Sequence, residues 1–209
     1  ATWEVPNGLE ATSSTLRTLT LTDGSEWIYV VVGLDGGYQA LRSDDGGANF
    51  ESIYDLGEYA GDLWAPRDGG NTLYLFDGMA TWRSDDYGDS WVELGAPDEL
   101  SNSGQIAGSE AGAPTLWLIL DSEALWRSDD AGENWSYMHP VSDYWGSLNA
   151  SASDPDVFAW GGVEVYRSID GGESFASVNF WGEYYGDPEN RLHADVPGID
   201  LVIDEDGSE

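Results

Sequence analysis

The chain has 209 residues, a length that an all-β protein commonly uses for a single domain. Its net charge is −33 and its seven basic residues are all arginines, so it repels nucleic acid and anionic membranes. It has no apolar run long enough to span a membrane, and the absence of cysteine excludes disulfides and thiol chemistry. The acidity has two competing explanations, adaptation to high salt or secretion with bound cations.

Residues 1–5 are predicted to be the last strand of a repeat unit, and the missing initial Met indicates a processed or trimmed chain. Four complete units follow, at about 6–53, 54–94, 95–138 and 139–178. Residues 179–209 are predicted to begin a further unit, with strands at 192–195 and 199–203. We therefore expect one domain over 1–209 that is part of a larger assembly, although the two ends could also meet in one shared unit.

Each complete unit is predicted to contain four short strands, because apolar and β-branched runs alternate there with turn residues. The first strands are expected at 16–21, 63–65, 105–107 and 148–150, and the second at 27–32, 72–76, 115–120 and 156–160. The third and fourth strands flank a nine-residue motif, which we call the box. Four-stranded units repeated at a period near 40 predict an all-β propeller in which each unit is one blade.

The box reads Arg-Ser-x-Asp-x-Gly-x-(Asn/Ser)-(Trp/Phe), and its four serines are 41, 44 and 40 residues apart. The aspartate and serine are expected to accept hydrogen bonds from the turn, the glycine to take a positive φ, and the aromatic residue to pack against the neighbouring unit. The preceding arginine (42, 83, 127 or 167) is within reach of the box carboxylates. We predict that the boxes are structural rather than catalytic. Their members are Ser43, Asp45, Gly47 and Phe50; Ser84, Asp86, Gly88 and Trp91; Ser128, Asp130, Gly132 and Trp135; and Ser168, Asp170, Gly172 and Phe175.

These residues resemble the Asp-box or BNR repeat, Ser-x-Asp-x-Gly-x-Thr-Trp, although Asn or Ser replaces Thr and two boxes end in Phe. Proteins with this repeat include sialidases, xyloglucanase-type glycoside hydrolases, the sortilin ectodomain and the photosystem II assembly factor. The resemblance implies a β-propeller with the box at the turn between the two outer strands of each blade. It also implies export to an extracellular or periplasmic location.

Ligand-binding residues are expected in the loops that join one unit to the next, at 54–64, 94–104, 138–146 and 179–191, on the face opposite the boxes. These loops combine aromatic rings with carboxylates, a combination that suits sugars or a protein segment. The aromatic residues could also simply pack between blades. The candidates are Tyr59, Trp64, Tyr144, Trp145, Trp181, Tyr184 and Tyr185.

A carboxylate stands at the same place between the second and third strands of three units, in Asp35, Asp77 and Asp121. Hard cations prefer several oxygen ligands, so these residues could bind Ca²⁺, or they could cap turns. The two histidines are too few and too far apart in the sequence for a transition-metal site.

Catalysis has weak support, because a glycosidase needs two carboxylates at a defined separation and this chain has carboxylates in excess. The Phe/Tyr-Arg-Ile-Pro segment of sialidases is absent. We expect a non-catalytic exported scaffold that binds a glycan or protein partner on the loop face, with another polypeptide or segment completing the propeller. The alternative is a sialidase- or xyloglucanase-like glycoside hydrolase whose active site is completed by residues outside this chain.

Overall fold

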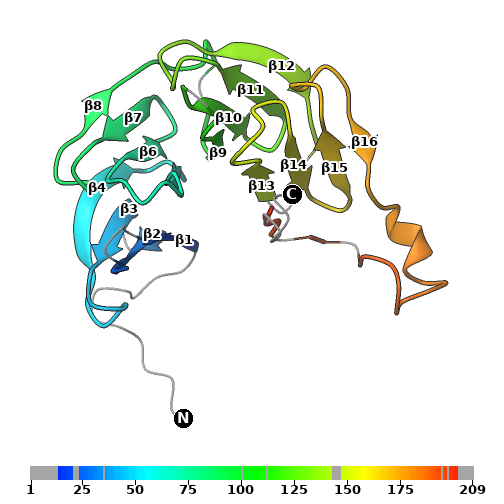
Figure 1. Cartoon of the computed structure of the whole chain (residues 1–209), viewed down its shortest axis with the longest axis horizontal. Helices are drawn as coiled ribbons and strands as arrows, with labels where there is room; N and C mark the ends of the chain where they lie inside the picture. Colours follow the sequence, from blue (N-terminus) through cyan, green and yellow to red (C-terminus); the bar gives the residue numbers. More distant parts are fainter. Residues whose placement is uncertain are drawn as a thin grey trace. The chain divides into compact units, whose positions relative to one another are not determined.

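Four antiparallel sheets of four strands each make up the regular part of the chain (Figure 1). The computed structural model describes residues 14–20, 24–34, 36–99, 101–111, 113–142, 147–193, 195–196 and 198–201. The chain divides into two compact units, Ala1–Gly104 and Gln105–Glu209, and each is described by itself. The prediction of one domain over the whole chain stays a prediction.

The first unit contains two sheets, in each of which the strands pair in sequence order. The first sheet consists of β1 (Ser14–Thr20), β2 (Glu26–Leu34), β3 (Gly37–Ser43) and β4 (Glu51–Gly57). The second consists of β5 (Asp62–Trp64), β6 (Leu73–Phe76), β7 (Thr81–Ser84) and β8 (Val92–Glu93).

The second unit repeats this arrangement. Its first sheet consists of β9 (Gly104–Ser109), β10 (Thr115–Leu120), β11 (Ala124–Ser128) and β12 (Ser136–Pro140). Its second consists of β13 (Ser147–Ala150), β14 (Phe158–Gly161), β15 (Val165–Ser168) and β16 (Ala176–Ser177). A short 3-10 helix, η1 (Trp181–Glu183), follows β16.

The four predicted four-stranded blades are confirmed, with every box between the third and fourth strand of its sheet. The strand ends were less well predicted, because β4 continues to Gly57 and β12 to Pro140, into segments expected to be loops. Since adjacent strands are antiparallel, the box lies at one end of its sheet. The turn between the second and third strands lies at the other end, together with the connection to the next sheet.

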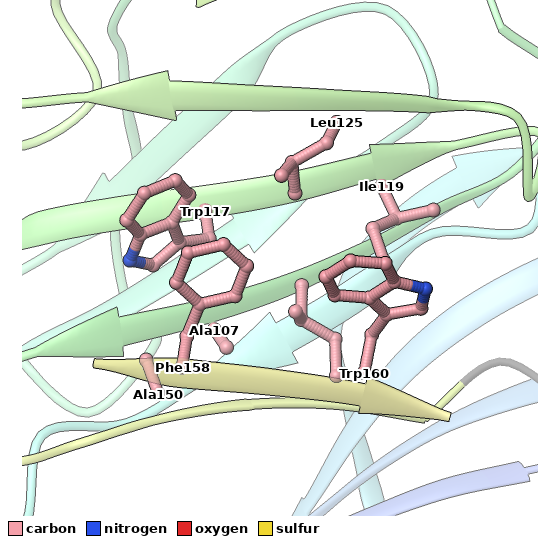
Figure 2. Packing of buried hydrophobic residues seen from close by; sticks show 8 residues of the cluster. Ala107, Trp117, Ile119, Leu125, Ala150, Phe158 and Trp160 are labelled. Atoms are coloured by element: carbon pink, nitrogen blue, oxygen red, sulfur yellow. The ribbon is translucent and has the colours of Figure 1, made fainter. Parts of the chain in front are cut away.

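Each unit has its core between its two sheets, and the second strands supply most of it. In the first unit, Tyr29 and Val31 of β2 pack with Leu73 and Leu75 of β6. In the second unit, Trp117 and Ile119 of β10 pack with Phe158 and Trp160 of β14 (Figure 2). Trp117 and Phe158 are stacked with their ring centroids 3.9 Å apart. Because these strands are buried on both faces, they read as continuous apolar runs, in contrast to the alternating pattern of a half-exposed strand.

The predicted strands at 192–195 and 199–203 are not formed in the part of this segment that the structure describes, and residues 1–5 lie outside the described ranges. Val196, Ile199 and Asp200 are held by side chains of β13 and by a backbone hydrogen bond, from the Val196 N–H to the Gly162 oxygen at 2.8 Å. Ser147 Oγ donates to the Val196 oxygen at 3.0 Å, and Asn149 Nδ2 donates to the Ile199 oxygen at 3.0 Å. Strand pairing instead requires a backbone ladder, which these contacts do not provide. Across the described ranges, the structure contains no helix with the length and apolar character that crossing a membrane requires.

Candidate functional site

All four boxes form the same hydrogen-bonded turn. In the first box, Ser43 Oγ donates to Asp45 Oδ1 at 2.8 Å and accepts from the Gly47 N–H at 2.9 Å. Asp45 Oδ1 also accepts from the Asn49 N–H at 3.0 Å, and Asp45 Oδ2 accepts from the Asn49 side chain at 2.7 Å. The contacts of Asp86, Asp130 and Asp170 follow the same pattern, with Ser90, Asn134 and Ser174 in the place of Asn49.

This network holds the box carboxylates ionised. Hydrogen bonds from the Asn49 side chain, the Asn49 backbone and Ser43 lower the pKa of Asp45 to about 2. The pKa values of the other three box aspartates are lowered in the same way. A carboxylate whose lone pairs are already bonded within its own turn is poorly placed to accept a proton from a substrate. The geometry therefore supports a structural role for the boxes.

The box glycine serves both the turn and the approach of a neighbouring sheet. Gly88 has φ +99°, and a Cβ there would lie 2.8 Å from Ile53 of β4. Gly172 has φ +88°, and a Cβ there would lie 3.4 Å from the Trp117 ring of β10. The closing aromatic residues make a contact of the same kind, since Trp91 Nε1 donates to the Ile53 oxygen and Phe175 lies edge-on to His139 of β12.

The box arginine links two consecutive sheets of a unit. Arg42 Nη1 donates to the Tyr87 oxygen at 3.0 Å and to Asp89 Oδ1 at 2.8 Å, both in the second box. Arg127 Nη1 likewise donates to the Gly171 oxygen in the fourth box and to Asp156 Oδ1, at 3.1 Å each. We call this bond, from a box arginine to the residue before the glycine of the next box, the arginine clasp. Both arginines also lie over a tryptophan ring of their own sheet. The guanidinium carbon is 4.8 Å from the ring centroid for Arg42 and Trp27, and 4.9 Å for Arg127 and Trp117.

The predicted ligand-binding aromatics do not form one described group. Tyr59 is half-buried against Gly78, and Trp64 is half-buried with its ring 5.6 Å from that of Tyr74. Both therefore serve as packing residues in the first unit. Tyr144 and Trp145 lie outside the described residues.

The remaining three candidates, Trp181, Tyr184 and Tyr185, come together in the second unit, in the segment drawn in orange beyond β16 in Figure 1. Trp181 lies edge-on to Tyr185, with their ring centroids 5.8 Å apart. The ring centroid of Tyr184 is 5.9 Å from that of Tyr185 and 4.5 Å from that of His193. Phe180 adds a fifth ring, 6.1 Å from Trp181. We call Phe180, Trp181, Tyr184, Tyr185 and His193 the aromatic cluster.

The aromatic cluster is exposed although it is anchored to the sheet. Tyr185 is 74% exposed and Trp181 42%, which is unusual for large aromatic side chains. The anchor is Val165, the first residue of β15: the Val178 N–H donates to the Val165 oxygen at 2.8 Å, and the Val165 N–H to Asn179 Oδ1 at 2.7 Å. The cluster therefore stands at the end of the sheet opposite the box, where the sequence predicted the binding loops.

Acidic side chains border the aromatic cluster. Glu183, Asp187 and Glu189 lie within or next to it in the sequence, and Glu183 forms an exposed ion pair with Arg191 at 3.2 Å. The sequence alone did not single out Phe180 and His193 as members. The density of aromatic residues between 180 and 193 was the signal that could have found them.

Of the three aspartates proposed for Ca²⁺, Asp77 has the clearest environment. Asp77 Oδ2 accepts from Tyr54 OH at 3.1 Å and from Trp82 Nε1 at 2.6 Å, and Oδ1 accepts from the Met79 and Ala80 N–H groups at 2.8 Å each. Asp121 is in a turn with φ 47°, and Asp35 lies outside the described residues. Within the described ranges no three His, Asp or Glu side chains are grouped so as to hold a metal ion. Calcium binding stays an untested prediction.

Comparisons with known proteins connect the chain with propeller structures. No protein-family model matches it, and neither does any curated protein. A GH74 enzyme from Niastella koreensis is similar in structure, with a TM-score of 0.55 and 15% identity over 80% of this chain and 24% of the enzyme.

Two further solved structures are similar. The GH74 xyloglucanase from Xanthomonas campestris has a TM-score of 0.49 and 19% identity over 72% of this chain and 28% of the enzyme. A structure of YCF48 bound to D1 peptide has a TM-score of 0.45 and 16% identity over 80% of this chain and 67% of that protein. The chain spans about a quarter of the length of the two enzymes. The likeness to the Niastella koreensis enzyme concerns the fold, and the four sheets are blades of the β-propeller type.

Proposed function

We propose that this chain is a non-catalytic propeller scaffold that binds a partner at the aromatic cluster. The observation that carries the proposal is the exposure of Trp181 and Tyr185 next to Tyr184 and His193, at the loop end of the last sheet. Rings of this size remain in water at a free-energy cost, which a bound partner would offset. A rigid blade beneath the cluster limits the entropy lost on binding.

The arrangement of the rings favours a protein segment over a glycan as the partner. Trp181 and Tyr185 meet at an interplanar angle of 87°, and Tyr184 and Tyr185 at 75°, so these rings are far from coplanar and do not form a flat platform. The carboxylates that border the cluster, together with the net charge of −33, attract cations. A polypeptide segment with Lys or Arg next to apolar side chains fits both features, because its cations can lie over ring faces and its apolar groups between them.

The test is the double variant Trp181→Ala/Tyr185→Ala, probed on a peptide array of basic–apolar sequences and on a glycan array. We expect peptide binding by the parent chain and its loss in the variant, with an unchanged melting temperature. Tyr137→Ala is the matched control, since Tyr137 is 51% exposed in the same unit and lies outside the cluster. Binding that survives in the double variant would contradict this placement, and binding to glycans alone would identify the other ligand class.

The proposal has three further parts. The chain is not catalytic, it is exported from the cytoplasm, and another polypeptide or segment completes the propeller. The box carboxylates support the first, because the turn itself uses their oxygens. Release of reducing sugar from xyloglucan or of sialic acid from a sialylated glycan by the purified chain would refute it. Export rests on the resemblance of the boxes, and fractionation of the producing cells tests it.

A further inference from the structure

The arginine clasp occurs once in each unit, and in both it joins the two sheets of the unit. Its donor is the arginine of one box, and its acceptor is the backbone oxygen of the residue before the glycine of the next box. That acceptor residue has a positive φ, 62° in Tyr87 and 70° in Gly171, which belongs to the shared turn geometry of the boxes. At the corresponding places of the second and third boxes stand Arg83 and Ala131, and the partner of Arg83 is Asp85 of its own box, so the clasp is described only within each unit.

Arg167 is a clasp donor for which the described residues provide no acceptor. It stands in β15 at the place that Arg127 has in β11, yet its side chain is exposed and has no hydrogen bond, ion pair or ring contact with any residue that the structure describes. The expectation that every box arginine reaches a box carboxylate is wrong here, because Ile169 occupies the place of Asp85 and Asp129. Those aspartates pair with Arg83 and Arg127 at 2.8 and 2.7 Å.

Two exposed residues next to Arg167 are apolar. Ile169 is 67% exposed, and Ala176, which pairs with Arg167 across β15 and β16, is also exposed. In the first sheet the corresponding pair is Arg42 and Glu51, which form an ion pair at 2.6 Å. We call Arg167, Ile169 and Ala176 the donor edge.

Gly46 is a clasp acceptor with no donor in the part of the chain that the structure describes. It precedes the glycine of the first box, as Tyr87 and Gly171 precede theirs, and has φ +73°. Gly46 is exposed, and its oxygen accepts no hydrogen bond from the described part of the chain, whereas Gly171 is buried beneath Arg127. The exposed carboxylates of Asp44 and Asp45 flank it, so this turn, the acceptor edge, is complementary in charge to the donor edge.

We propose that the donor edge of one copy of this chain binds the acceptor edge of a second copy, with Arg167 donating to the Gly46 oxygen. The contact is head-to-tail and makes the sheet β13–β16 of one copy and β1–β4 of the other consecutive blades. The contact involves β15 and β16, which carry Arg167 and Ala176. Val196 and Ile199 already cover the sheet at Gly161 of β14.

The first test compares the solution mass of the parent chain with that of Arg167→Ala by sedimentation at several concentrations. We expect the parent to sediment with at least twice the mass of one chain and Arg167→Ala to sediment as single chains with an unchanged far-UV spectrum. Arg191→Ala is the control, because Arg191 is an exposed arginine of the same unit that pairs locally with Glu183. A single-chain parent, or equal masses of parent and Arg167→Ala, would overturn the proposal.

The second test does not depend on a destabilising change and uses the absence of native cysteine. Ile169→Cys is introduced in isotopically heavy chains and Asp44→Cys in light chains, and the mixture is treated with a short bismaleimide. Heavy–light conjugates joining positions 169 and 44 support the proposal. No conjugate, or attachment of a co-purifying different polypeptide to position 169, excludes the second copy as the occupant. A chain that carries both cysteines is treated in the same way, and a cross-link that forms only within single chains would also exclude the second copy as the occupant.

Discussion

Arg42 Nη1 lies 3.0 Å from the backbone oxygen of Tyr87, 45 residues further along the chain. Arg127 Nη1 lies 3.1 Å from the backbone oxygen of Gly171, 44 residues further along. The two distances describe one contact repeated at the period of the blades. It gives the arginine of the box a function separate from that of the serine and aspartate, which close the turn within one sheet, whereas the arginine joins two sheets.

Replacing Arg127 by Ala is expected to destabilise the second unit by about 1–3 kcal/mol. Its side chain is 16% exposed and donates to Gly171 and Asp156, and hydrogen bonds of charged groups contribute about this much. Urea unfolding monitored by tryptophan fluorescence measures the change. Arg191→Ala removes an exposed ion pair and should cost at most about 1 kcal/mol. Equal costs would show that the clasp contributes nothing beyond a surface charge.

Asp45→Asn is expected to be less stable than the parent chain at neutral pH and to approach it in acid. The hydrogen bonds to Asp45 lower its pKa from the ordinary 3.8 to about 2, so they stabilise the ionised folded form. That stabilisation is fully present above about pH 4 and is lost as the pH falls through 2. Denaturant titrations of both proteins between pH 7 and 2 test this. A difference in unfolding free energy that stays constant over this range would contradict it.

Gly172→Ala is expected to cost about 1–2 kcal/mol, because a left-handed conformation is strained in any residue with a Cβ. At Gly172 the φ is +88° and the added carbon would lie 3.4 Å from the Trp117 ring, which has little room to move between the sheets. Gly198→Ala is the control in the same unit, since a Cβ there meets nothing within 4 Å. Thermal unfolding of the two variants should separate them, and an equal effect would count against the packing constraint.

Asp77→Ala is expected to destabilise the first unit equally in calcium and in EDTA. Its carboxylate accepts from Tyr54, Trp82 and two backbone N–H groups, and its removal leaves these donors without their partner at a cost of about 1–3 kcal/mol each when buried. Differential scanning calorimetry of parent and variant in both buffers provides the measurement. A loss of stability confined to the calcium buffer would instead assign Asp77 to a cation site.

The amino-acid sequence by itself determined the blades. The period near 40, the apolar runs and the Ser-x-Asp-x-Gly turn predicted four four-stranded sheets, and the structure confirms them. This was possible because a hairpin depends on neighbours in the sequence: a positive φ calls for glycine, and a turn calls for a side chain that bonds its own backbone. Strand ends such as that of β4 were predicted less well, because hydrogen bonding to the adjacent strand decides where a strand stops.

Only the tertiary structure showed which groups meet across sheets. The acceptor of Arg42 is a backbone oxygen, which every residue has, so no residue type at position 87 announces it. The donors to Asp77 come from Tyr54 in one sheet and Trp82 in the next, and the gathering of Tyr184 with His193 depends on the fold of the segment after β16. Contacts of this kind are set by packing between elements distant in the sequence. That Arg167 has no partner among the described residues therefore became visible only beside the paired Arg42 and Arg127.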